Sequence, residues 1–447
     1  MKLLHCTVLL LAGLAATQVL AWGNHTLAAY RAFEKMPEVA NAAPVMVEPL
    51  ESFLRAEEVT LEALLASQEA WALANLEKYP ARPVELLFTS DPARSDEARR
   101  TAFLMALRVA TNSKFALFCQ PDPWNPASGT PLPYGAVSTL PQTASERAQY
   151  LAMSAGDVVA PLTVLASATD EPDYGLDIHL WEDSPSEWGH AYGFGVQPFG
   201  NPSLPYVSQA PFHMGFMHES RLLKLAVPFI KRNFPLLRAH QYASLASLAF
   251  RTGHAYWGWR FAGLSLHYLQ DLTQPFHASL APGESSARVM TANALAIAGL
   301  PGPKNDLLIL LSNRRLVLEK YQLEWMQRAA ARQQETALER ALHNLDQDRS
   351  YPDWNDRYLR DTVSLQAGRA AAALAQALVA TMPAQYVSDP GFDFGSQESS
   401  IHLLAQLAGH ESPERARLDA AMVELMGNFG AHSRNALRGI LRESTPH

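Results

Sequence analysis

Apolar side chains recur every three or four positions along most of the chain, in Ala- and Leu-rich segments with few β-branched runs. This spacing places the apolar side chains on one face of a helix. We therefore expect an all-α protein, with helices over residues 25–36, 46–77, 94–112, 144–168, 214–234, 241–272, 305–344, 355–381 and 399–444.

Irregular segments rich in Pro and Gly separate these helices: 119–142, 170–212, 278–304 and 382–398. Segment 170–212 carries eight aromatic residues. An ordered loop of this length is usually functional, and the alternative is a lid whose aromatic side chains only pack on the helices. No linker divides the chain clearly. We expect one main helical domain over 22–345 and a helical C-terminal extension over 346–447 that packs on it.

The N-terminal segment has the pattern of a signal peptide. Lys2 precedes a mostly apolar run from Leu3 to Leu20, and Ala21 ends a cleavage pattern. The alternative is a retained membrane anchor, but the run is barely long enough to span a bilayer and includes polar residues. We expect residues 1–21 to be removed, which predicts an exported protein, secreted or periplasmic, that begins at Trp22. No other stretch is apolar enough to span a membrane.

Composition narrows the possible chemistry. Asp and Glu total 44 against 36 Lys and Arg, a formal net charge of −8, which disfavours a protein that binds nucleic acid through a broadly basic surface. The two cysteines, Cys6 and Cys119, exclude a disulfide framework and a Cys-rich zinc module. The 15 histidines make imidazole the ligand type to examine.

The strongest local motif is His267-Tyr-Leu-Gln-Asp271-Leu-Thr-Gln-Pro275-Phe-His277. His267 and Asp271 are four residues apart, so on a helix they share one face. Pro275 ends the helix, and the chain can then bring His277 back towards the pair. Imidazole and carboxylate are ligands that zinc accepts. The alternatives are a buried pair satisfied by hydrogen bonds and a surface pair; the apolar surroundings disfavour the surface pair.

This motif, HYLQDLTQPFH, resembles the signature of the zinc-dependent phospholipase C and single-strand nuclease superfamily. Two shorter matches accompany it: Trp22-Gly23 with His25 close behind, and Glu171-Pro172-Asp173-Tyr174 followed by Gly189-His190-Ala191-Tyr192. The matches stand in the family's order over residues 22–319. The resemblance implies a multi-helix bundle with long irregular loops.

The resemblance also implies a metal centre with two zinc ions. One zinc would be held by Asp173, His190, His267 and Asp271. Asp271 would bridge to a second zinc, bound also by His25 and by the amine and carbonyl groups of Trp22. Asp173 and Asp271 would be the catalytic carboxylates, with Asp173 as the general base.

A third zinc site of the family is in doubt in this chain. The resemblance assigns His277 and Glu319 to it, but Arg315 stands where a further histidine is expected. A guanidinium has no lone pair to donate to a metal. The third site is therefore absent, filled by another side chain, or replaced by Arg315 as a phosphate clamp.

Other polar residues receive more modest interpretations. His213 and His218 are five apart and face different sides of a helix, so we expect structural roles for them. Asp177 and His179 are reserve ligands, should Asp173 not be one. The aromatic loop offers Trp188 and Tyr192 for substrate binding, because aromatic faces can hold a choline ammonium or stack on nucleobases.

These observations favour a secreted or periplasmic zinc-dependent phosphodiesterase of phospholipase C type, which hydrolyses a phosphatidylcholine-like phospholipid by metal-activated water. Such an enzyme would contact a membrane surface transiently. Two alternatives stay open: a single-strand nuclease or nucleotidase with the same fold, and a metal-binding protein with reduced catalysis. The acidic charge weighs against a polyanionic substrate, and Arg315 is the main support for the metal-binding protein.

Overall fold

The computed structural model describes residues 22–142 and 148–445. Helices account for 62% of the chain and strands for 3%, which confirms the all-α class. The expected signal peptide, residues 1–21, lies outside the described residues. Among the helices described, none combines the length and apolar character that crossing a bilayer requires.

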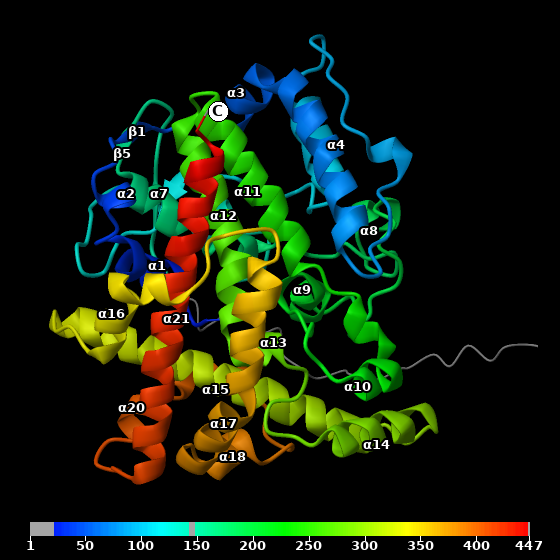
Figure 1. The fold of residues 1–447 in the computed structure, drawn as a ribbon, viewed down its shortest axis with the longest axis vertical. Helices are drawn as coiled ribbons and strands as arrows, with labels where there is room; N and C mark the ends of the chain where they lie inside the picture. Colours follow the sequence, from blue (N-terminus) through cyan, green and yellow to red (C-terminus); the bar gives the residue numbers. More distant parts are fainter. Residues whose placement is uncertain (1–21, 143–147, 446–447) are drawn as a thin grey trace, which may run out of the picture.

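Helix α12, Ala255–Thr273, lies at the centre of the molecule (Figure 1). Every residue from Tyr256 to Thr273 is buried, as expected for a helix that is largely apolar on all sides. It packs along α11, Pro235–Arg251, which precedes it in the chain. The helices that also contact α12 include α7 (Pro161–Ala168), α17 (Leu365–Thr381) and α21 (Pro413–Glu443).

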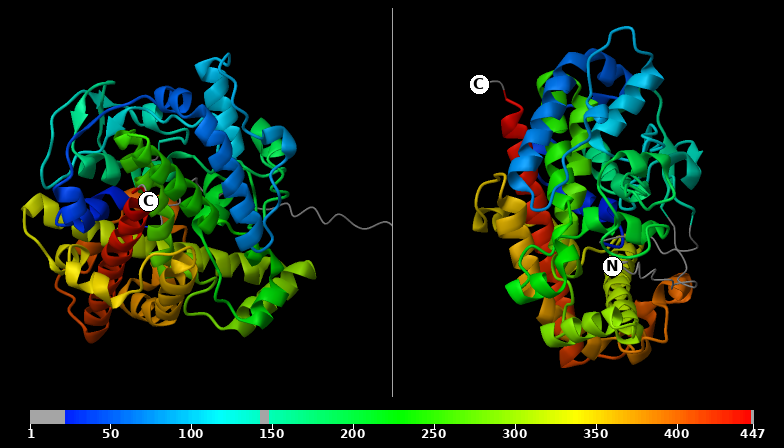
Figure 2. Two further views of the ribbon diagram at one scale, coloured as in Figure 1. Left: turned by 45° about the horizontal axis from the view of Figure 1, so that its top comes forward. Right: turned by 90° about the vertical axis from the view of Figure 1, so that its right-hand side faces the viewer.

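A second layer crosses this central group. Helix α15, Gly302–Arg332, runs across the lower end of α12 in Figure 1, with α14, Ser286–Ile297, packed beside its start (Figures 1 and 2). The remaining helices are α1 (His25–Phe33), α2 (Pro37–Ala40), α3 (Leu50–Ala56), α4 (Glu58–Asn75), α5 (Asp96–Leu107), α6 (Tyr134–Val137), α8 (Glu187–Ala191), α9 (Pro205–His213), α10 (Arg221–Ala226), α13 (Pro275–Ala278), α16 (Ala337–Leu342), α18 (Ala384–Val387), α19 (Phe394–Gln397) and α20 (Leu403–Gln406).

Short turns and strands complete the chain. Tight 3-10 turns lie at η1 (Val84–Leu86), η2 (Glu171–Tyr174), η3 (Pro228–Lys231), η4 (Leu345–Ser350) and η6 (Glu398–Ser400), and η5 (Leu359–Ser364) is a wider π-helical turn that leads into α17. Strand β1 (Val45–Met46) pairs antiparallel with β5 (Val158–Val159), with Val45 opposite Val159. A second antiparallel sheet has the order β2–β4–β3, from Phe118–Cys119, Tyr150–Ala152 and Pro131–Leu132.

Several expected elements differ from the structure; the long helices expected over 46–77, 241–272 and 305–344, for example, are each two helices. Residues 144–168 are expected to be one helix, but among the described residues 148–168 only α7 is helical; it starts at Pro161, which favours the first position of a helix. Residues 278–304 were expected to be irregular, yet they contain α14, capped by Ser285. The last long helix begins at Pro413 rather than at residue 399, because the proline starts it and Ser412 caps it.

The C-terminal segment contributes to the centre of the molecule. Helix α21 contacts α1, α11 and α12. On α21, Phe429 packs against the ring of Trp22, and the Ser433 hydroxyl accepts a hydrogen bond from Gln270 of α12. The domain division near residue 345 stays a prediction, but residues after it help to enclose the region described next.

Candidate metal centre

A buried cluster of histidine and aspartate side chains lies where α1, η2, α9 and α12 meet. It consists of His25, Asp173, His213, His267 and Asp271, each at most 3% exposed. One set of ligand atoms within 4.8 Å of one another comes from His25, Asp173 and His267, and another from His213, His267 and Asp271. These buried groups can hold a metal ion, and His267 belongs to both sets.

Helix α12 supplies the middle of the cluster. His267 Nε2 lies 3.3 Å from Asp271 Oδ2, one helical turn away, and 3.7 Å from Asp173 Oδ1. The same Nε2 lies 3.0 Å from His213 Nδ1. Across the cluster, His25 Nε2 lies 3.4 Å from Asp271 Oδ1. The expected approach of His267 and Asp271 on one helix face is therefore present, and the tertiary fold adds the other three side chains.

Two of the histidines are oriented by hydrogen bonds from their other ring nitrogen. His267 Nδ1 lies 2.7 Å from the carbonyl oxygen of Thr169, to which it donates. His25 Nδ1 donates to Gln270 Oε1 at 2.9 Å, while the amide nitrogen of Gln270 donates to Ser433. In both rings Nε2 then carries a lone pair directed into the cluster. Metal-binding histidines show this arrangement in general.

His213 is oriented by a carboxylate. Its Nε2 lies 3.4 Å from Asp177 Oδ2, and its Nδ1 faces Asp271 Oδ2 at 2.9 Å. Asp177 in turn accepts hydrogen bonds from Arg238 Nε and the Tyr268 hydroxyl, both at 2.7 Å. Burial favours protonation of Asp177, but the Arg238 charge outweighs it and lowers the pKa of this carboxyl. Asp177, paired with Arg238 and Tyr268, thus lies behind His213 and belongs to neither set of ligand atoms.

Several polar atoms of the cluster have no hydrogen-bond partner among the described residues. They include His25 Nε2, Asp173 Oδ2 and Asp271 Oδ1. Leaving such atoms buried without a partner costs about 1–3 kcal/mol each. A cation at the centre accepts these lone pairs and removes the cost, so the residues present fit a bound metal.

The charges of the cluster are strongly coupled. Burial disfavours the charged form of His25, but contact with Asp271 outweighs it and raises the His25 pKa to about 9. Burial also disfavours the charged form of His213, but Asp177 and Asp271 together outweigh it and raise the His213 pKa to about 10. Burial raises the Asp173 pKa to about 6. Asp271 is held well below its usual pKa, because His267 and His213 overcome its burial. The buried carboxylates of Asp173 and Asp271 are therefore stabilised by nearby positive charge, which bound protons or a metal ion can supply.

A second group borders the cluster. His277 donates from Nδ1 to the His213 carbonyl at 3.0 Å, and its Nε2 has no hydrogen-bond partner among the described residues. On α15, Glu319 Oε1 accepts from Arg315 at 3.3 Å and from Gln274 at 3.2 Å. The guanidinium of Arg315 therefore contacts the carboxylate that the resemblance assigned to a third zinc.

Burial and the charge of Arg315 shift the pKa values of the two titratable groups next to Arg315, which are His277 and Glu319. Burial, together with the Arg315 charge, lowers the pKa of His277 to about 3 against the opposing effect of Asp271, so its imidazole is neutral. Burial raises the Glu319 pKa to about 8, against the opposing effect of Arg315. The guanidinium of Arg315 is thus a buried cation at the position that the resemblance assigned to a third zinc.

Trp22 is buried beside the cluster. Its indole Nε1 donates to the Gln270 carbonyl at 3.0 Å and lies 3.1 Å from Thr273 Oγ1. The next amide, Gly23 N, donates to Gln322 Oε1 on α15 at 3.1 Å. A Cβ at Gly23 would stand 2.6 Å from the Glu319 carbonyl oxygen, so only glycine permits this approach. Coordination by the amine and carbonyl of Trp22 stays a prediction.

The structure does not bring His190 to the cluster, and this expectation is corrected. His190 is exposed on α8. Its neighbour Gly189 is the residue that faces inwards, because a Cβ there would stand 2.5 Å from the carbonyl oxygens of His179 and Trp181. The short helix therefore directs His190 to solvent, and His213 takes the place expected for it.

The two aromatic residues expected to bind substrate have packing roles instead. Tyr192 is fully buried, and its hydroxyl donates to the Val109 carbonyl. Trp188 is half-buried and donates to the Ile178 carbonyl at 3.3 Å. For these two residues, the interpretation of the loop as a packed lid is the better one.

His213 is the cluster residue that the sequence did not indicate. It ends α9, while His218 is exposed beyond that helix and hydrogen-bonded to the Arg360 carbonyl. Nothing in the local spacing separates the two histidines; only the packing of α9 on α12 does so.

No protein-family model, no curated protein and no solved structure compared with the chain matches it. The resemblance to the phospholipase C and nuclease superfamily therefore rests on the motifs quoted above. The geometry of the cluster does not depend on this resemblance.

Proposed function

We propose that the protein is a zinc-dependent phosphodiester hydrolase of phospholipase C type. The observation that carries this proposal is the buried cluster of three imidazoles and two carboxylates with lone pairs directed at common points. Imidazole nitrogen and carboxylate oxygen are the ligands of catalytic zinc sites. The two oxygens of Asp271 face different histidines, Oδ1 towards His25 and Oδ2 towards His213 and His267, so in our proposal the cluster would hold two neighbouring ions.

Zinc in such a site lowers the pKa of water and neutralises charge on a phosphoryl group. The residues of the chain perform the remaining tasks. Asp173 has one oxygen near His267 and a second, Oδ2, without a hydrogen-bond partner among the described residues. In our proposal that carboxylate orients the attacking water and accepts its proton.

Arg315 is the proposed phosphate clamp. Its guanidinium is 5% exposed and is held by Glu319 at 3.3 Å. A guanidinium donates several N–H groups in a fixed plane, which matches the oxygens of a phosphate. In our proposal Arg315 provides the positive charge that a third metal ion would otherwise supply.

The substrate proposed is a phosphatidylcholine-like phospholipid, cleaved at the glycerol-side ester, and the proposed setting is the periplasm or the cell exterior. The apolar segment Leu3–Leu20 supports export. The formal net charge of −8 favours a lipid over a nucleic acid.

One observation favours a second candidate, a metal-binding protein without catalysis. Every cluster side chain is at most 3% exposed, so a substrate reaches the centre only if the surrounding elements move. A closed set of protein ligands is typical of structural zinc sites, while catalytic sites keep a position open.

The test is a zinc count and an activity assay on the exported form. We expect about two zinc ions per chain, the number that a binuclear hydrolytic site requires, and hydrolysis of phosphatidylcholine that a chelator abolishes. His267→Gln should lose both zinc and activity. His254→Gln is the matched control, because this histidine at the start of the same helix pairs with Glu48 at 2.9 Å instead.

Other outcomes would decide against the proposal. Hydrolysis of single-stranded DNA alone would identify a nuclease, and bound zinc with neither activity would support the metal-binding protein. Absence of zinc from the correctly processed chain would reject the metal centre. Arg315→His should raise the zinc count if the guanidinium occupies a third site.

A further inference from the structure

Helices α10 and α14 and the start of α15 project from one end of the molecule (Figures 1 and 2). Twelve large hydrophobic side chains are exposed in the described part of the chain, and this projection holds five of them. Large exposed apolar areas mark interaction sites. We call these five the α10–α14 surface: Leu222 (69% exposed), Leu225 (76%), Ile297 (79%), Leu300 (60%) and Leu308 (48%).

Side-chain contacts join the three elements into one surface. Asn293 Nδ2 of α14 donates to the Ala226 carbonyl at the end of α10, at 3.1 Å. Ile297 lies one turn after Asn293, and Leu225 directly precedes Ala226. The Lys304 ammonium of α15 lies 5.7 Å from the centre of the Phe229 ring, just beyond α10.

These helices already bury their other faces. Beneath the α10–α14 surface is a small separate core of seven buried residues: Phe216, Leu223, Val227, Ile230, Val289, Ala292 and Leu307. The exposed leucines and isoleucine are therefore additional to the apolar residues that the fold needs here.

The charge around the surface is opposite to that of the chain as a whole. Residues 219–234 and 284–308, which span the surface, contain six basic residues and three acidic ones, a net charge of +3 in a chain of formal net charge −8; the acidic residues are Glu219, Glu284 and Asp306. Two of the six have ion-pair partners: Lys231 with Glu77 at 3.0 Å, and Arg288 with Glu284 at 2.6 Å. The other four form no ion pair with any described residue: Arg221, Lys224, Arg232 and Lys304.

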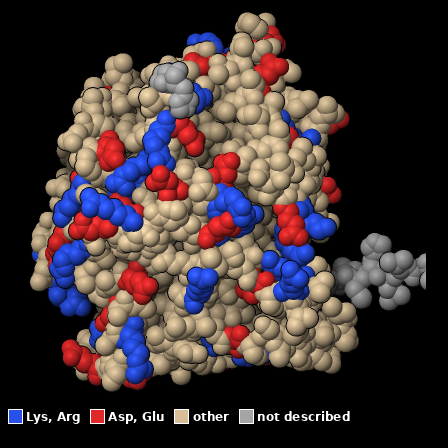
Figure 3. All heavy atoms as spheres, in the orientation of Figure 1, with Lys and Arg blue, Asp and Glu red and all other residues tan. Residues whose placement is uncertain are grey.

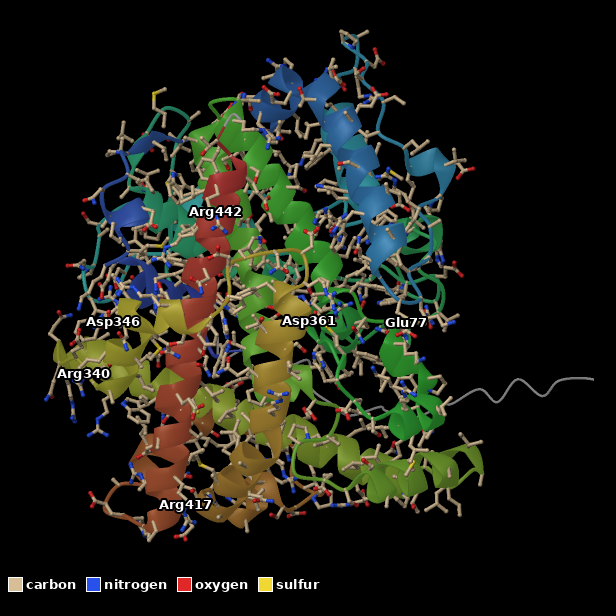
Figure 4. All side chains as sticks on the ribbon, viewed as in Figure 1. Glu77, Arg340, Asp346, Asp361, Arg417 and Arg442 are labelled. Atoms are coloured by element: carbon tan, nitrogen blue, oxygen red, sulfur yellow. The ribbon has the colours of Figure 1, made fainter. Side chains whose placement is uncertain are left out.

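The figures show the same distribution. In Figure 3, the lower right of the molecule, over α10 and α14, is an area of uncharged residues with basic side chains beside it. Figure 4 shows Glu77, the ion-pair partner of Lys231, near the upper end of α10.

We propose that the α10–α14 surface docks the protein on an anionic lipid surface. Leu and Ile on a projecting tip, surrounded by Lys and Arg, are typical of elements that insert into the headgroup region. The centres of protein–protein interfaces are instead rich in aromatic residues and poor in Lys. The proposal deepens the proposed function, on which the choice of a lipid as substrate rests.

Docking in this way also places the metal centre near the membrane. Leu308 and Arg315 lie seven residues apart on α15, about 10 Å at the usual rise of a helix. The same helix therefore carries part of the docking surface and the proposed phosphate clamp.

The test compares two triple variants in vesicle flotation, with the zinc-loaded exported protein. Leu222→Ser/Leu225→Ser/Ile297→Ser should weaken binding to mixed phosphatidylglycerol and phosphatidylcholine vesicles about 100-fold, because three apolar anchors are lost. The matched control, Leu73→Ser/Val84→Ser/Leu87→Ser, removes three exposed apolar side chains elsewhere and should bind as the original protein does. Arg221→Glu/Lys224→Glu should weaken binding to the mixed vesicles but not to phosphatidylcholine alone.

The readouts separate docking from catalysis. Vesicle binding should persist after chelation of zinc, and hydrolysis of short-chain phosphatidylcholine below its micelle concentration should be equal in both triple variants. Vesicle binding without any hydrolysis would leave docking intact and reject the proposed function. Equal vesicle binding by the two triple variants would overturn the docking proposal. So would self-association that only the first variant abolishes, because the surface would then bind a second copy of the chain.

Discussion

At the scale of single residues, the cluster depends on which ring nitrogen each histidine presents. Thr169, Gln270 and Asp177 each offer an oxygen to one nitrogen of a cluster histidine. The opposite nitrogen then faces Asp173 or Asp271 without competition from water. Supporting groups of this kind are worth about 10–100-fold in metal affinity, so the residues behind the ligands are as informative as the ligands.

The first prediction concerns His213 and His190. The sequence pointed to His190 as a metal ligand, whereas the structure places His213 in the cluster. His213→Gln should lower zinc affinity by at least about 100-fold, because loss of a ligand exceeds loss of a supporting group. His190→Gln should leave affinity unchanged, because this side chain is exposed on α8. Competition with a chromogenic chelator measures both. The opposite ranking would restore the expectation from the sequence and reject the cluster described here.

At the scale of elements, close helix packing places the ligands that come from different segments. Helices α7 and α12 meet at Gly263, where a Cβ would stand 2.5 Å from the Leu165 carbonyl oxygen. Helix α7 leads directly into η2, which carries Asp173. Arg260 of α12 also pairs with Glu171 of η2, at 2.9 Å. The distance from Asp173 to α12 is thus set by packing on both sides of η2.

The second prediction tests this packing. Gly263→Ala should lower the free energy of unfolding by about 2 kcal/mol, the typical cost of an added methyl group in a packed interior. It should also weaken zinc binding by displacing Asp173. Gly368→Ala is the control, because the nearest atom outside its own helix, the Ala278 carbonyl oxygen, would be 3.6 Å from the new Cβ. That variant should gain about 0.5–1 kcal/mol from the helix preference of Ala over Gly. Chemical denaturation measures both changes, and equal effects would contradict the role of Gly263.

At the scale of the whole molecule, the cluster joins parts of the chain that lie far apart in sequence. Its ligands span residues 25 to 271, and α21 packs over the same region through Phe429 and Ser433. A metal bound there stabilises the arrangement of α1, η2, α9 and α12 together. Metal binding and global stability should therefore be linked.

The third prediction follows from that linkage. Zinc at about 1,000 times its dissociation constant should add about 4 kcal/mol to the free energy of unfolding, and a chelator should remove it. Calorimetry should show a clear fall in melting temperature on chelation. A His25→Gln variant should show a much smaller fall, since part of its site is already lost. An unchanged melting temperature in the original protein would show that the folded chain binds no metal.

The sequence by itself determined the helical class, the placement of His267 and Asp271 on one helix face, and the turn at Pro275. These features depend on neighbours within a few residues, where helical geometry leaves little choice. Only the tertiary structure decided that His213 enters the cluster, that His190 faces solvent, and that Asp177 supports a ligand. The physical reason is that these side chains meet across helices, and helix packing sets their relative positions without any trace in the local spacing. The same holds for the α10–α14 surface, whose leucines have the pattern of core residues until the fold leaves one face of each helix uncovered.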